Sequence, residues 1–79
     1  MRMDLRLIRA HLAQAERHVA LSDKHIARQI EIIDELGHAD QSTDLALDIL
    51  ATYRLLRASH VEHRDMIRRE LGIEVPSLI

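Results

Sequence analysis

Apolar residues in the first half of the chain recur at alternating intervals of three and four positions. This is the periodicity of an amphipathic helix that packs along its whole length. Asp4 is placed to cap such a helix at its start, and Gly37 to end it in the left-handed conformation. The pattern therefore predicts a helix over residues 5–36. Its main stripe consists of Leu5, Ile8, Leu12, Ala15, Val19, Ser22, Ile26, Gln29, Ile33 and Leu36, with Ile30 beside it.

A second helix is predicted over residues 44–71, where Gly72 follows as its stop signal. The segment GHADQST, residues 37–43, has the composition of a turn, and Asp40, Ser42 or Thr43 can cap the helix that follows. A connection this short makes the two helices antiparallel neighbours. The main stripe of the second helix is Leu45, Ile49, Tyr53, Leu56, His60, His63, Ile67 and Leu71. The fold class expected is all-α, and residues 1–79 form one antiparallel helical hairpin whose extended tail, residues 72–79, docks on a groove.

Each predicted helix also carries a second stripe, about 90° from the first, in which large apolar residues alternate with polar ones. Two packed helices enclose no interior, so a lone hairpin of 79 residues leaves much apolar surface in water. We therefore expect the hairpin to form a homodimer, a four-helix bundle closed by these second stripes. The dimer-interface candidates are Leu7, His11, His18, Leu21, His25, Ile32, Leu55 and Met66.

The composition excludes several classes of protein. The chain has no cysteine, and its one aromatic residue is Tyr53, so neither a disulfide framework nor a β-sandwich core is expected. It contains no glycine-rich phosphate loop and no nucleophile beside a base, so we do not expect an enzyme. The first residues, MRMDLRLIRAHL, lack the apolar segment of a signal peptide, and no run approaches the ~20 apolar residues of a membrane span. A cytoplasmic location without a membrane partner is the expectation.

The six histidines raise the question of a metal site. His11, His18 and His25 are seven residues apart, which separates neighbours by about 10.5 Å along a helix, too far for one ion. His60 and His63 have the closer spacing that metal-ligand pairs on a helix need. In an antiparallel hairpin, facing residue numbers should add up to about 79, because the turn lies near residues 39–40. One hypothesis is therefore a Zn²⁺, Ni²⁺ or Cu²⁺ site made of His18, His60, His63 and Glu16.

The favoured alternative is that these histidines are structural, with neutral imidazoles hydrogen-bonding across the helix–helix seam. A third reading is a pH-responsive contact, since unperturbed imidazoles titrate near ~6.5. If His60 and His63 are buried and neutral, the stability of the bundle should fall between about pH 7 and pH 5. The sequence leaves these three readings open.

A ridge of arginines on the second helix is a candidate contact for an anionic partner. Its members are Arg54, Arg57, Arg64 and Arg68. The ridge can meet phosphates or an acidic protein. The alternative, which we favour, is a solvated face paired with nearby acids such as Asp65. The net charge of −2 and the lack of aromatic residues between the arginines argue against nucleic acid.

The segments AHLAQAERHV, DKHIARQIEIIDEL and ASHVEHRDMIRREL resemble those of a group of short bacterial hypothetical proteins. These share the pattern HLAxAERH…HIARQ in a first helix and a histidine-containing second helix that ends in RDxxxxEL. The resemblance covers about residues 11–71 and implies a helical fold, but no function and no site residues. The function expected first is a small non-enzymatic interaction or structural module, a homodimer that binds a protein partner. The alternatives are a transition-metal-binding protein and a phosphate- or nucleic-acid-binding protein.

Overall fold

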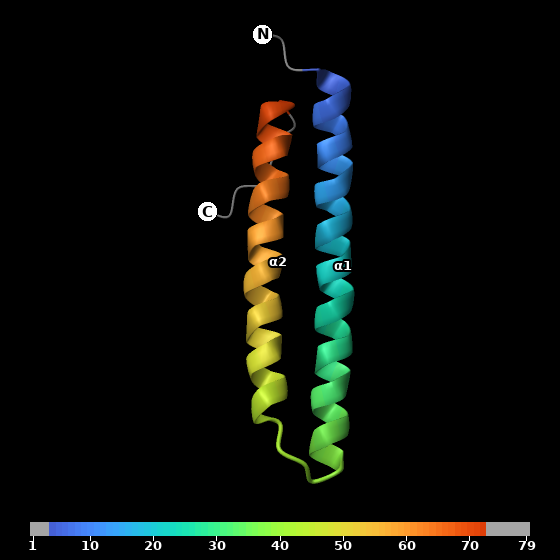
Figure 1. Cartoon of the computed structure of the whole chain (residues 1–79), viewed down its shortest axis with the longest axis vertical. Helices are drawn as coiled ribbons and strands as arrows, with labels where there is room; N and C mark the ends of the chain where they lie inside the picture. Colours follow the sequence, from blue (N-terminus) through green and yellow to red (C-terminus); the bar gives the residue numbers. More distant parts are fainter. Residues whose placement is uncertain (1–3, 73–79) are drawn as a thin grey trace.

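The computed structural model describes residues 4–72, which form two long antiparallel helices joined by a short turn (Figure 1). Helix α1 spans Leu5–His38 and helix α2 spans Asp44–Glu70. The helices lie side by side along their length, and the molecule measures 59 × 28 × 15 Å. The predicted all-α hairpin is confirmed, with helix ends within two residues of the expected ones. The predicted docking of the tail concerns residues 73–79, which lie outside the described residues.

The two ends of α1 are fixed by aspartates. At its start, the Asp4 carboxylate accepts a hydrogen bond from the backbone N–H of Arg6 at 2.9 Å, which confirms the predicted cap. At its other end the prediction for Gly37 is wrong, because α1 continues through it and Asp40 takes the left-handed conformation, with φ of 54°. The N–H of Gln41 then bonds back to the carbonyl of Leu36 at 2.9 Å, and that of Asp40 to Gly37 at 3.3 Å. This is a Schellman motif, in which aspartate fills the place usually held by glycine.

The second helix ends as expected. Gly72 has a φ of 73°, and its N–H bonds to the carbonyl of Arg69 at 3.0 Å. At the start of α2, the Thr43 side chain makes no capping hydrogen bond, and the hydroxyl of Ser42 accepts one from the N–H of Asp44 at 3.4 Å. Over residues 4–72, neither helix has an apolar segment of the length and hydropathy that a membrane crossing requires.

The buried seam between the helices agrees with the predicted stripe on α1 but only in part with the one on α2. The buried residues are Ile8, Ala15, Val19 and Gln29 of α1 and Ala46, Leu50 and Ile67 of α2. Of the predicted α2 stripe only Ile67 is buried, whereas Leu45 is 72% exposed and Leu56 50% exposed. The predicted α2 stripe is therefore only partly correct: Ile67 is buried and Ile49, Tyr53, His60 and Leu71 are half-buried, but α2 is turned so that Ala46 and Leu50 face α1 more closely.

Compared with the prediction, α2 is turned about its own axis. The reason is the set of contacts that the side of α2 carrying Ala46, Arg57 and Arg68 makes with α1. The side-chain amide of Gln29 donates to the carbonyl of Ala46 at 2.9 Å, deep in the seam. Farther along, Arg57 pairs with Asp23, and Arg68 lies 3.5 Å from Glu16. Long arginine stems cover apolar surface while their charged ends reach solvent. The buried Gln29 bond holds Ala46 at the seam, and Arg57 and Arg68 lie along its margin.

Candidate functional site

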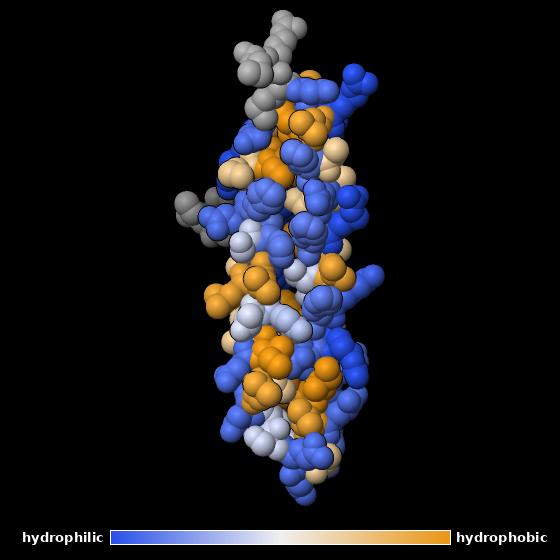
Figure 2. Space-filling model, in the orientation of Figure 1, coloured by the Kyte–Doolittle hydropathy of each residue, from blue (hydrophilic) through white to orange (hydrophobic). Residues whose placement is uncertain are grey.

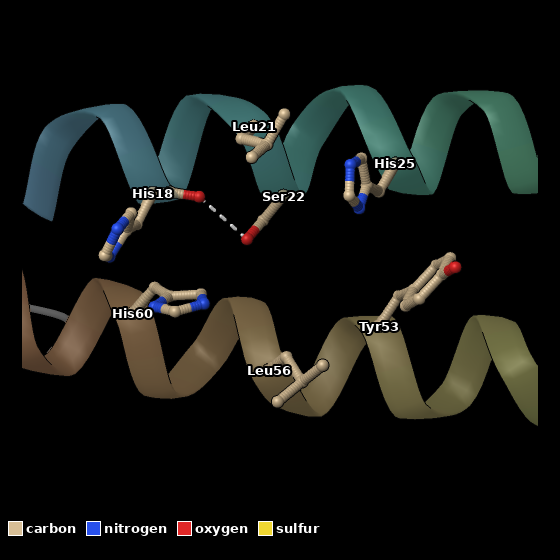
Figure 3. Close-up of a pocket in the computed structure, with 7 residues that line it drawn as sticks. All are labelled: His18, Leu21, Ser22, His25, Tyr53, Leu56 and His60. Atoms are coloured by element: carbon tan, nitrogen blue, oxygen red, sulfur yellow. Dashed lines mark hydrogen bonds between the residues drawn. The ribbon is translucent and has the colours of Figure 1, made fainter.

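The rotation of α2 leaves its predicted stripe beside an open groove between the helices. This groove has a volume of about 310 Å³. It is lined by His18, Leu21, Ser22 and His25 of α1 and by Tyr53, Leu56 and His60 of α2 (Figure 3). Residues assigned by the sequence to two separate surfaces, the α1 interface stripe and the α2 seam, thus meet in one place.

Two aromatic pairs bridge the groove from helix to helix. The ring centres of His18 and His60 are 5.2 Å apart, with an angle of 58° between the ring planes. Those of His25 and Tyr53 are 5.7 Å apart at 52°. Figure 3 shows the two pairs at opposite ends of the groove, with the Ser22 hydroxyl between them donating to the His18 carbonyl at 2.9 Å. Both pairs agree with the predicted register, in which facing residue numbers add up to about 79.

Two further hollows continue this groove along the hairpin. One, of about 290 Å³, is lined by His11, Gln14, Ala15, His18 and His63, and so shares His18 with the groove. The other, of about 480 Å³, is lined by Leu45, Asp48, Ile49, Thr52 and Tyr53, and so shares Tyr53. We call the residues that line the groove and these two hollows the open face. Five of the six histidines lie on it.

The sixth histidine and the exposed charge pairs near the turn lie elsewhere. His38 Nδ1 is 2.8 Å from the carbonyl of Asp34 and 3.6 Å from its carboxylate. On the surface of α1, Arg28 contacts Glu31 at 3.1 Å and Glu35 at 3.2 Å. The hydrogen bond to Glu31, followed by the one to Glu35, raises the pKa of Arg28 above its ordinary value. These groups form a solvated charge cluster outside the open face.

The dimer-interface candidates from the sequence fall into two groups. His11, His18, Leu21 and His25 lie on the open face, and all four are exposed. Met66 lines a separate hollow with Ser59, Glu62, His63 and Arg69, which adjoins the open face at His63. Leu7 is 56% exposed and Leu55 74% exposed, and Ile32 is half-buried. The structure therefore brings together the α1 candidates in the middle of the helix, and Leu55 stands apart from them.

The predicted metal set is not assembled. His18 and His60 are neighbours, but Glu16 lies against Arg68, with 3.5 Å between Oε1 and Nη2. His63 is exposed and opens into the hollow that contains His11. Among residues 4–72, no three or more histidine, aspartate or glutamate side chains converge as a group that could hold a metal ion. The condition for the predicted loss of stability in acid is also not met, because His63 is exposed and His60 only half-buried.

The arginine ridge is largely paired with carboxylates. Arg57 contacts Asp23, Arg64 contacts Asp65 at 3.0 Å, and Arg68 contacts Glu16 at 3.5 Å. These three arginines are half-buried, while Arg54 is exposed. Three of the four arginines of the ridge are therefore paired with carboxylates along the seam. They do not form a row of unpaired cations that could bind a phosphate.

Four groove residues were assigned to the seam by the sequence, and of these Ser22, Tyr53 and Leu56, unlike His60, were not site candidates. Their apolar or small side chains gave no signal of exposure. Comparison of the chain with protein-family models, with curated proteins and with solved structures found no match.

Proposed function

We propose that this protein is a non-enzymatic interaction module, whose hairpin pairs with a second copy through the open face to form a four-helix bundle. The observation that carries the proposal is the position of Leu45, Ile49, Tyr53 and Leu56, which line the open face instead of the seam. A stripe of large apolar side chains along an exposed helix face is typical of a surface that another protein covers. Figure 2 shows hydrophobic side chains gathered over both helices in the half of the molecule nearest the turn.

The accessible surface of the chain supports a second copy of the hairpin as the partner. The hairpin has an accessible surface of 6470 Å². A compact monomer of the same mass exposes only about 4,900 Å², so the excess is roughly 1,600 Å². A standard protein–protein interface removes about 800 Å² from each partner. The surface of the chain is thus large enough for an interface of standard size.

The charge pattern favours a second copy as the occupant. In a two-fold interface the same surface of each copy is in contact with that of the other. A net charge on this surface would therefore face a like charge on the second copy and repel it. The residues that line the open face within the described chain include one carboxylate, Asp48, and no lysine or arginine. The charged residues of both helices lie mostly on other faces. Self-pairing thus brings histidine, glutamine and apolar side chains together, with no lysine or arginine among them.

Sedimentation equilibrium at micromolar protein concentration tests this proposal. The expected mass is about twice the 9.1 kDa of one chain. Leu56→Glu should give a folded monomer, because it places a charge in the groove. Leu55→Glu is the matched control, since Leu55 is the neighbouring residue on α2 and lines none of the hollows of the open face, and it should leave the dimer intact.

Two results would contradict the proposal. A wild-type chain that is monomeric at tens of micromolar would exclude a second copy as the occupant. Equal loss of the dimer in Leu55→Glu and Leu56→Glu would show that a different face forms the interface. Circular dichroism of each variant establishes that the helices are retained.

A further inference from the structure

We propose that His18 and His60 bind one divalent transition-metal ion between the two helices. Their ring centres are 5.2 Å apart, and the planes are inclined at 58°. With Zn–N bonds of ~2.0–2.1 Å, each ring centre stands about 3.2 Å from the ion, and two such rings at a tetrahedral angle are about 5 Å apart. The observed separation of 5.2 Å is compatible with a shared ion, as it is with a tilted contact between the two rings.

This pair differs from the arrangements that the sequence suggested, because its two ligands come from different helices. Along α1, the heptad spacing keeps His18 about 10.5 Å from His11 and from His25. On α2, His63 lines the adjoining hollow together with His11 and His18. The antiparallel register sets His18 opposite His60 without using a shared helix face (Figure 3).

The surroundings of the pair suit a cation. No lysine or arginine lines the groove, so no fixed positive charge opposes the ion there. Ser22 also lines the groove, and its hydroxyl donates a hydrogen bond to the His18 carbonyl. His18 is exposed and His60 half-buried, so water can fill the remaining coordination positions. Imidazole ligands suit Cu²⁺, Ni²⁺ and Zn²⁺, with Cu²⁺ bound most tightly in the general order of affinities.

A bound ion would join the helices near the middle of the hairpin. The two histidines are 42 positions apart in the chain, so the unfolded chain does not hold them together. An ion that binds the folded state alone raises the melting temperature in proportion to the logarithm of its concentration. Metal-dependent stabilisation is therefore the signature of this site, and it is measured at one fixed protein concentration because the proposed dimer would cover the same face.

The first test is the melting temperature with and without Ni²⁺ at pH 7.5, together with calorimetric stoichiometry. We expect one Ni²⁺ per chain and a rise of at least about 5 °C at saturating metal. His18→Asn and His60→Asn should each abolish the rise and weaken binding at least tenfold. His25→Asn is the matched control on the same face and should keep the rise within about 1 °C of wild type.

The second test needs no substitution. The electron paramagnetic resonance spectrum of Cu²⁺ bound to the wild-type chain should show hyperfine coupling to two imidazole nitrogens. The proposal is overturned by Ni²⁺ binding only above about 1 mM, by equal losses in the His25 and His60 variants, or by a Cu²⁺ spectrum with a single nitrogen. It is also overturned if half an ion binds per chain while the mass doubles, because the ion would then bridge two chains.

Discussion

The side-chain amide of Gln29 donates a hydrogen bond to the backbone carbonyl of Ala46, with 2.9 Å between the two atoms. Gln29 is 6% exposed, and it is the buried polar residue of the described part of the chain. A buried amide needs a partner, and here the partner belongs to the first turns of α2. Ala46 is thereby held against α1, and Leu45, which is about 100° away around the helix, is turned to the open face.

Substitution of Gln29 tests the strength of this contact. Gln29→Ala removes the donor and leaves a gap in the seam, so we expect a loss of about 1–3 kcal/mol in the free energy of unfolding. For a chain of this size the melting temperature should fall by about 4–8 °C for each kcal/mol. Thermal unfolding followed by circular dichroism measures this. Lys24→Ala, at an exposed position of the same helix outside the open face, should cost less than about 0.5 kcal/mol, and equal effects of the two variants would show that the buried hydrogen bond does not contribute.

The sequence predicted the hairpin, its register and the buried stripe of α1, because each depends on local periodicity and on the length of the turn. It predicted the buried face of α2 only in part. Leu45 and Leu56 lie on one apolar stripe and Ala46 and Leu50 on another, and periodicity alone does not choose between them. The choice depends on contacts with α1, above all the Gln29–Ala46 hydrogen bond. The groove was missed for the same reason, although its α1 half was predicted as an exposed interface.

Gly37 provides a second prediction. It lies within α1, its φ is not positive, and a Cβ added there would meet nothing within 4 Å. Gly37→Ala should therefore stabilise the protein by roughly 0.5–1 kcal/mol, since alanine loses less conformational freedom in a helix. Gly72→Ala is the contrasting variant and should destabilise it, because Gly72 has a φ of 73°. If Gly37→Ala lowered the midpoint of urea unfolding instead, the helix would not continue through this residue.

Ala15 lies at a position of the helix–helix contact that requires a small side chain. It is 2% exposed and packs in a cluster with Ile8 and Ile67. Ala15→Leu forces extra atoms into this cluster and should cost about 1–3 kcal/mol in the free energy of unfolding. Ala13→Leu, on an exposed position of α1, should change it by less than about 0.5 kcal/mol. Denaturant titrations of both variants would refute close packing if the two leucines were tolerated equally.

The ion pair between Arg57 and Asp23 should contribute little to stability despite joining the two helices. Its side chains are 41% and 55% exposed, so water screens the attraction. A double-mutant cycle with Asp23→Asn and Arg57→Gln should give a coupling energy below about 1 kcal/mol. The coupling should shrink further in about 1 M salt. A coupling above about 2 kcal/mol that persisted in salt would mean that this pair, rather than apolar packing, holds the middle of the hairpin.

The turn at residues 39–43 has a kinetic consequence. The contact between Gln29 and Ala46 spans 17 positions of the chain, whereas the contact between Glu16 and Arg68 spans 52. Closing the longer loop first costs about 1 kcal/mol more chain entropy than closing the shorter one. During folding, the contacts between the helices should therefore form first beside the turn and last at the opposite end. In the folded protein, that opposite end should open most often. Amide hydrogen exchange should be slower at the buried positions nearer the turn, Gln29 and Leu50, than near Ile8 at the far end, so the two halves of α1 would differ in their exchange rates.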